Sequence, residues 1–462
     1  MVVKTPDDPE KALSQVGGQV LPYYLPDLLQ YVETDIAKAR ARLASLKKVK
    51  DQPVQLKAQL DEFTQLLPPY SELGSQLRRT ISEKEKLQIL ELSTVNFSVE
   101  TITSKRSGVV EFGSLLSALE PFREVVKKIN FSNSTVVVGA NAYQILKLAD
   151  YPKLTDLNLS GIQPTTGFWT AVGQLKQVRR LWLSGATISD DDLNKLLVAC
   201  SDRLELVDLS SLTVKKGSET LDGDVWVEQA LVPAHDLRFA CLKYLSLAGN
   251  KLTNQDLAAL DRFVCLQGLN LADNPEITDV GLKKLEHIAL LKDLSLSGTG
   301  HPKRGSAAVT DAGVAGLLTR NKATLNYLNL SGTTTLADPT SPAISAIHEM
   351  GLLESLNMAG TAINNHGLRK IWKFADKALA AVVGAEAEVF RPFPWLLALD
   401  VSDTAVTDAG FIDMDEIGFP RLQTIRSKTT DLNVTTGGIN RRNALLPARY
   451  PGNFNLATLV KQ

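Results

Sequence analysis

One short pattern of apolar positions recurs along most of this chain. A leucine or valine is followed three residues later by a second apolar residue and two residues after that by a third, and then by a small residue and a turn residue. Alternation of apolar and polar positions over so short a stretch predicts a strand with one buried face. The regular copies begin at Leu154, Val178, Leu204, Leu242, Leu266, Leu291, Leu325, Leu353 and Leu396.

Weaker copies of the pattern extend it toward both ends of the chain. They begin at Leu87, Val126 and Leu422. The compact copies are spaced by about 25 residues, which is the length of one strand and one helix with two short connections. Four steps are longer and predict insertions, and they follow the copies at Leu87, Leu204, Leu291 and Leu353.

The second half of the repeating unit predicts a capped helix. In the segment from Ile277 to Leu282, Thr278 suits a helix N-cap and Asp279 suits the positive end of the helix dipole. Related segments begin at Ile188, Leu252, Val309, Ile363 and Val406. Each unit therefore reads as strand, turn, cap and helix, and each packs only on its neighbours.

The strand pattern together with the Ile-Thr-Asp-x-Gly-Leu motif resembles the ribonuclease-inhibitor-like, or cysteine-containing, class of leucine-rich repeats. The resemblance covers roughly residues 87–426. It implies an α/β solenoid, a horseshoe with a parallel sheet on the concave side and helices on the convex side. The substrate-receiving halves of F-box proteins belong to this class, but the motifs are specific to the fold and assign no functional residue.

Two heptad-like apolar stripes precede the repeats. They run from Leu29 to Leu46 and from Leu56 to Tyr70, with Pro53 between them, which predicts an α-helical hairpin. The hairpin either caps the open end of the solenoid or projects to dimerise or dock a partner. We therefore divide the chain into four parts: a flexible arm at 1–26, the hairpin at 27–82, an array of about twelve units at 83–428, and an irregular tail or cap at 429–462.

Composition narrows the function classes. The 50 basic and 51 acidic side chains nearly balance, which disfavours a dedicated nucleic-acid binder. No apolar run has the roughly 20 residues that a membrane span needs, and no secretory signal is readable. Cys241 and Cys265 occupy equivalent positions in successive units, where we expect stacked, buried free thiols. These features favour the cytoplasm or another reducing compartment.

The concave face is the first candidate for partner binding. Aromatic side chains and arginine contribute most to binding energies at protein interfaces. We therefore expect the anchors to be the large side chains beside the inward-facing leucines, which are Arg180, Trp182, Tyr244 and Tyr327. The alternative is that they are ordinary solvent-facing strand residues.

The long inserted segments are the second candidate, because insertions in a repeat gather on one face. Their candidate residues are Trp226, Lys303, Arg304, Phe393 and Trp395. Alternatively the inserts are surface decoration, with Phe393 and Trp395 packed into the core.

Catalytic patterns are absent from the sequence. The five histidines are scattered, and no His-Glu-x-x-His, Cys-x-x-Cys or Gly-x-Ser-x-Gly motif occurs. Carboxylates such as Asp279, Asp311 and Asp408 stand at helix-cap positions. We therefore expect no enzyme, cofactor or metal, but a scaffold that binds a protein partner. The alternatives are a structural subunit of a larger assembly and a substrate-receiving adaptor of a ubiquitin ligase.

Overall fold

The computed structural model describes residues 19–21, 94–96 and most of 110–426. The gaps in the last range are residues 125, 133–136, 139, 224, 228–238, 240, 264, 300–308, 334–335, 337–339, 376–387, 391–392, 394, 408–409, 411–421 and 423. The expected helical hairpin at 27–82 and tail at 429–462 lie outside the described residues.

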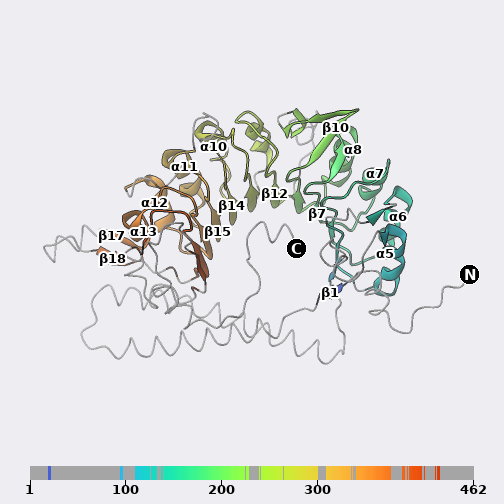
Figure 1. Ribbon diagram of the computed structural model, residues 1–462, viewed down its shortest axis with the longest axis horizontal. Helices are drawn as coiled ribbons and strands as arrows, with labels where there is room; N and C mark the ends of the chain where they lie inside the picture. The colour runs from blue at the N-terminus through green and yellow to red at the C-terminus, as the bar shows by residue number, and fades with distance from the viewer. Residues whose placement is uncertain are drawn as a thin grey trace, which may run out of the picture.

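A curved sheet lines the inner side of an arch, and helices lie along its outer side (Figure 1). Within the described residues the sheet has 13 strands. In spatial order they are β1 (Gln19–Leu21), β2 (Thr94–Asn96), β4 (Lys128–Asn130), β6 (Asp156–Asn158), β7 (Arg180–Trp182), β9 (Leu206–Asp208), β12 (Tyr244–Ser246), β13 (Gly268–Asn270), β14 (Asp293–Ser295), β15 (Tyr327–Asn329), β16 (Ser355–Asn357), β19 (Ala398–Asp400) and β20 (Thr424–Arg426). The α/β solenoid with a parallel concave sheet is confirmed.

Stacking of equivalent leucines fixes the sheet. From β2 to β20 every neighbouring pair is parallel, and the central apolar residues pair with one another, as Leu269 does with Leu245 and Leu294. Each of these three side chains is at most 2% exposed. Burying a leucine contributes about 1.5–3 kcal/mol, so the apolar triplets form one continuous core.

The outer side carries short helices, some of which begin at the expected caps. They are α5 (Phe112–Leu119), η1 (Glu120–Phe122), α6 (Ala142–Leu146), η2 (Lys147–Asp150), α7 (Phe168–Val172), α8 (Asp190–Cys200), η3 (Asp256–Arg262), α10 (Asp279–Lys284), α11 (Asp311–Asn321), α12 (Pro342–His348) and α13 (Asn365–Trp372). Thr310 accepts a hydrogen bond from the backbone of Gly313, and Ser341 accepts one from Ile344. The cap motif is confirmed at α8, α10, α11 and α13, whereas η3 begins after Gln255 with no side-chain cap bond.

The residue after a cap has a role that the sequence did not reveal. Asp279 accepts hydrogen bonds from the backbone N–H and the hydroxyl of Thr310, the cap of the following unit, at 2.8 and 2.7 Å. Asn365 likewise accepts from the backbone N–H of Thr407 and donates to its hydroxyl, both at 2.7 Å. Asp279 therefore joins adjacent units, in addition to standing at the start of its own helix.

Asn274 joins neighbouring units more extensively. Its side-chain amide donates to the carbonyl oxygens of Leu247, Leu271 and Ala272. Its side-chain oxygen accepts from the backbone of Asn250 and Leu252 at 3.1 and 2.9 Å. Because Asn274 is fully buried, these bonds satisfy turn groups that water cannot reach.

The N-terminal side of the described sheet begins with β1 and β2. The copy expected at Leu87 lies outside the described residues, and the first described strand of the parallel set is β2, whose Val95 pairs with Ile129 and fits a copy of the pattern that starts at Leu92. Gln19–Leu21 lie within the expected flexible arm, yet they form β1 antiparallel to β2. That pairing satisfies the backbone groups of a sheet edge.

Parts of the inserted segments have regular structure. Within the insert after Leu204, β10 (Thr213–Lys216) and β11 (Glu219–Leu221) form an antiparallel hairpin, and β10 also pairs with β8 (Thr187–Ser189). Another insert begins with β17 (Lys373–Ala375) and later returns as β18 (Glu388–Phe390). A small pair, β3 (Val110–Glu111) and β5 (Val137–Val138), lies near α5.

The described residues include no helix that is both long and apolar enough to cross a membrane. Cys200 is buried, whereas Cys241 and Cys265 are exposed. The expectation that the latter two are buried is therefore wrong. Each stands immediately before the first leucine of its copy, outside the buried triplet, as do the exposed side chains of Leu290 and Leu352.

Candidate partner-binding face

Two rows of side chains lie on the concave face, because residues on either side of an inward leucine point to the opposite side of the sheet. The first row precedes the central apolar residue, and from β6 to β16 it reads Asp156, Arg180, Leu206, Tyr244, Gly268, Asp293, Tyr327 and Ser355. The second row follows it and reads Asn158, Trp182, Asp208, Ser246, Asn270, Ser295, Asn329 and Asn357.

Most of the second row is occupied with turn formation. The side-chain oxygen of Asn158 accepts a hydrogen bond from the backbone N–H of Ser160 at 3.0 Å. The same hydrogen bond, donated by the backbone N–H two residues later in the chain, is accepted by the side-chain oxygens of Asn130, Asn270, Asn329 and Asn357. This Asx turn ends each strand, so these asparagines have a structural role on the concave side.

Asp208 takes the asparagine position of the second row but carries a charge. One carboxylate oxygen, Oδ1, accepts from the backbone and hydroxyl of Ser210 at 3.0 and 2.5 Å. The residue is fully buried, and that burial raises its pKa to about 6. An aspartate therefore does here what a neutral asparagine does in other units.

Arg180 is held in place by its neighbour in the first row. Its Nε lies 2.6 Å from Oδ1 of Asp156, and its Nη2 donates to Oδ2 at 3.0 Å. Asp156 is buried, whereas the Arg180 side chain is 43% exposed. A bidentate guanidinium–carboxylate pair fixes orientation as well as charge, so Arg180 presents an ordered surface.

A glycine on β13 makes room for an aromatic ring. A Cβ added to Gly268 would lie 2.3 Å from Cδ1 of Tyr244, so the tyrosine ring lies over the position where a side chain would stand. Asp293 follows Gly268 in the same row. Burial raises the pKa of Asp293 to about 7, and the negative charge of Glu354 adds to that effect. Burial and the charge of Asp293 likewise raise the pKa of Tyr244.

Tyr327 continues the row on β15. Its hydroxyl donates to Oε2 of Glu354 at 2.9 Å, and Asn326 donates to the other carboxylate oxygen at 3.2 Å. Tyr327 is half-buried, as Tyr244 and Arg180 are. The first row thus brings together three of the four concave residues that the sequence suggested.

The remaining suggested residues do not join this row. Trp182 lies in the second row and is only 5% exposed. Trp226 and Phe393 are in the core, so neither offers a surface for contact, and Trp395 is half-buried. Lys303 and Arg304 lie outside the described residues.

Sequence reasoning did not select four residues at the concave face as candidates for binding: Gly268, Asp293, Glu354 and Asp208. Only Asp208 had a readable signal, since it is an aspartate at a position that several other units fill with asparagine.

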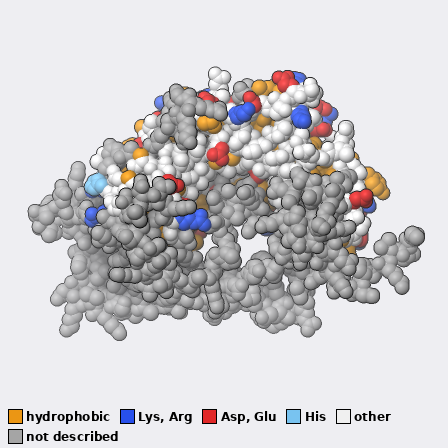
Figure 2. Space-filling model, in the orientation of Figure 1, with side chains coloured by type: hydrophobic (Ala, Val, Ile, Leu, Met, Phe, Trp, Pro, Cys, Tyr) orange, Lys and Arg blue, Asp and Glu red, His pale blue; other side chains and the backbone are white. Residues whose placement is uncertain are grey.

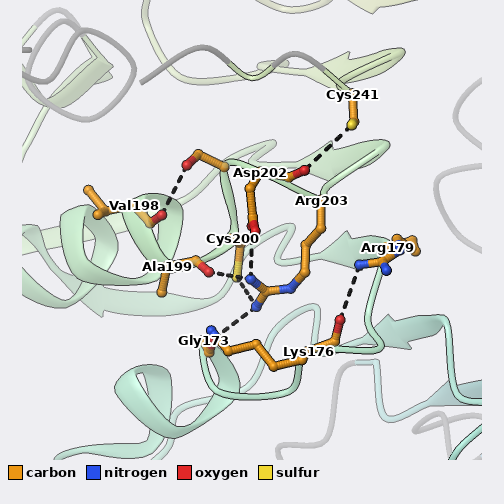
Figure 3. Close-up of polar contacts among 10 residues, drawn as sticks. Gly173, Lys176, Arg179, Val198, Ala199, Cys200, Asp202, Arg203 and Cys241 are labelled. Atoms are coloured by element: carbon orange, nitrogen blue, oxygen red, sulfur yellow. Dashed lines mark hydrogen bonds and ion pairs between the residues drawn. The ribbon is translucent and has the colours of Figure 1, made fainter. Parts of the chain in front are cut away.

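A second polar cluster, at the end of α8, is structural (Figure 3). Buried Arg203 donates through Nη2 to the carbonyl oxygen of Gly173 at 2.8 Å and to Sγ of Cys200 at 3.1 Å. Its Nη1 donates to the carbonyl oxygen of Ala199. Burial raises the pKa of the Cys200 thiol, which opposes formation of a nucleophilic thiolate. The cluster therefore caps helices and joins units.

Acidic and basic side chains are interspersed over the described part of the face in Figure 2. Among the described residues, no three His, Cys, Asp or Glu side chains gather as metal ligands.

Comparison with known proteins supports the repeat architecture. A family model described as Leucine Rich repeat matches residues 264–285, which include β13 and α10. No curated protein matches the chain.

Two solved structures are similar to the chain at 14% sequence identity. One is a TLR13–ssRNA13 complex, with a TM-score of 0.35 and coverage of 71% of this chain and 46% of that chain. The other is internalin C2 from Listeria monocytogenes str. 4b F2365, with a TM-score of 0.28 and coverage of 64% and 87%. This chain thus spans less than half the length of the TLR13 chain. The repeated strands and the match at residues 264–285 show that the chain has the leucine-rich repeat fold.

Proposed function

We propose that this protein is a non-catalytic scaffold that binds a protein partner through the concave face between β7 and β16. The observation that carries the proposal is the row formed by Arg180, Tyr244 and Tyr327 on a continuous sheet. All three side chains are half-buried. They are also the residue types that contribute most binding energy at interfaces.

The contacts within the row favour binding, because they order its side chains before a partner arrives. Asp156 fixes Arg180, and Glu354 fixes the hydroxyl of Tyr327. Side chains that are already ordered lose less conformational entropy on association, which is about 0.5–1.5 kcal/mol for each immobilised side chain. A preformed surface of this kind suits specific recognition.

The positions of the perturbed carboxyl groups favour binding over acid–base catalysis. Asp208 and Asp293 stand on β9 and β14, which are separated by β12 and β13. Neighbouring strands are about 4.8 Å apart, so roughly 14 Å separates the two positions. Carboxyl groups so far apart do not share a proton or act on one bond.

One observation favours a second role, as a structural subunit of a larger assembly. The position before the first leucine is exposed and apolar in several units, and its occupants are Cys241, Cys265, Leu290 and Leu352. Leu290 and Leu352 are 49% and 43% exposed. A row of apolar side chains along one rim is a feature of surfaces that are covered in complexes.

Affinity purification with quantitative mass spectrometry separates the two roles. We would compare the parent with a Tyr244→Ser/Tyr327→Ser variant and a Leu290→Ser/Leu352→Ser variant. Tyr143→Ser is the matched control, because Tyr143 on α6 is 76% exposed. Loss of a partner in the Tyr244/Tyr327 variant alone supports concave binding, whereas loss in the Leu290/Leu352 variant alone supports the structural role. If both folded variants retain every partner that the parent binds, both proposals are contradicted.

A further inference from the structure

Apart from Oδ1 of Asp156, which forms an ion pair with Arg180, four buried polar atoms on the concave face lack hydrogen-bond partners among the described residues. They are Nδ2 of Asn158, Nε1 of Trp182, Oδ2 of Asp208 and Oδ1 of Asp293. These side chains are between 0% and 5% exposed. A buried donor or acceptor that is left unpaired costs about 1–3 kcal/mol of folding free energy. The presence of each of these four unpaired atoms therefore requires an explanation.

The four residues follow the arch. Asn158, Trp182 and Asp208 pair in register on β6, β7 and β9, which are consecutive strands of the sheet. Asn158 and Trp182 each supply a hydrogen-bond donor, and Asp208 supplies an acceptor. Asp293 supplies the second acceptor on β14. The half-buried ring of Tyr244 is on β12, a strand that lies between those of the two carboxyl groups.

The turn that follows β9 does not require a charged residue at position 208. The Asx turn at the end of its strand is made equally by Asn158 on β6 and by Asn270 on β13. Burial raises the pKa of Asp208 to about 6, so ionisation near neutral pH opposes folding. A buried charge that destabilises the fold, where a neutral residue would serve, is typical of functional positions.

The remaining charges of this region are already paired. The guanidinium of Arg180 is held by Asp156, and the carboxylate of Glu354 accepts from Tyr327 and Asn326. Asp208 and Asp293 each keep an unpartnered oxygen. The face is therefore complementary to a positively charged ligand at these two points.

We propose that the concave face from β6 to β14 binds an extended segment of a partner protein through two basic side chains, lysine or arginine, received by Asp208 and Asp293. Trp182 and Asn158 donate to backbone carbonyl oxygens of the same segment. The proposal rests on the protein-binding function above and specifies the chemistry of the partner.

The strand spacing sets the distance between the two basic residues. Asp208 and Asp293 are separated by three strand spacings, or about 14 Å at 4.8 Å each. An extended chain rises about 3.3 Å per residue, so the basic residues are about four positions apart. The Tyr244 ring between them adds a surface on which a cation is stabilised.

Selection from a display library of random 12-residue peptides tests the proposal. The full-length parent is the bait at pH 8, where both carboxyl groups are ionised, and an Asp208→Asn/Asp293→Asn variant is used for counter-selection. We expect enriched peptides with two basic residues about four positions apart. The double variant should bind them at least tenfold more weakly, and Asp208→Asn alone should show an intermediate loss by fluorescence anisotropy.

Asp400→Asn is the matched control, because Asp400 accepts the same turn hydrogen bond, from Ser402 at 2.9 Å. It should bind the peptides as the parent does. The proposal is overturned if no peptide is enriched, if enriched peptides lack basic residues, or if parent and variants bind them equally. Partner capture that depends on Tyr244 and Tyr327 but not on Asp208 or Asp293 would overturn this inference alone and leave the scaffold function standing.

Discussion

The ring of Tyr244 lies over Gly268 of the next strand, at the position that a side chain there would occupy. Gly268→Ala would place its Cβ 2.3 Å from Cδ1 of Tyr244, so the ring has to move. We expect the free energy of unfolding to fall by about 1–3 kcal/mol, as measured by urea denaturation.

The same substitution in a Tyr244→Ala background provides the control. Without the ring, alanine at position 268 should be neutral or slightly stabilising, because glycine is the poorer residue inside a strand. An equal loss of stability in both backgrounds would show that the strain lies elsewhere.

Asp208→Asn should stabilise the protein in a pH-dependent way. The pKa of Asp208 is raised from 3.8 to about 6 in the folded state, so the folded state binds the proton more tightly than the unfolded state does. The parent should therefore lose stability as the pH rises from about 4 to about 6, and no further above that range. The variant keeps the turn contact but cannot ionise.

The difference in unfolding free energy between variant and parent should consequently widen over that window, by about 1–3 kcal/mol. Urea denaturation at intervals from pH 4 to pH 8 measures it. Ionisation of Asp293 occurs in both proteins and cancels in the difference. A difference in unfolding free energy between variant and parent that does not change with pH would contradict the assignment of the raised pKa to Asp208.

Asn274→Ala should destabilise the array strongly. It removes five hydrogen bonds, three to the preceding unit and two within its own turn, and leaves buried backbone groups unpaired. We expect a loss of about 2–4 kcal/mol by thermal or urea unfolding. Asn357→Ala is the comparison, since that side chain accepts the single turn bond from Ala359, and it should cost about 1 kcal/mol.

Arg203→Met should weaken the contact between α7 and α8. Methionine fills similar volume but leaves the carbonyl oxygens of Gly173 and Ala199 without the donors that Arg203 supplies. We expect a loss of about 2–4 kcal/mol by urea denaturation. Arg179→Met is the control, because Arg179 donates one exposed hydrogen bond, to the carbonyl oxygen of Lys176. Equal losses in the two variants would contradict a specific role for Arg203.

The sequence by itself determined the repeat architecture. Leucines at fixed spacing, as at Leu242 and Leu266, require a strand whose inward side chains stack on those of its neighbours. The Thr278 motif likewise determined where α10 begins. Such features depend on residues close in the chain and on a fixed period, so one copy predicts the next.

Only the tertiary structure decided which side chains are available for binding. Trp226 and Phe393 look like surface anchors in the sequence but are buried in the fold. The row that joins Tyr244 to Asp293 depends on the absence of a side chain at Gly268. Contacts of this kind involve residues on different strands, and their burial depends on how the strands pack, so no local pattern records them.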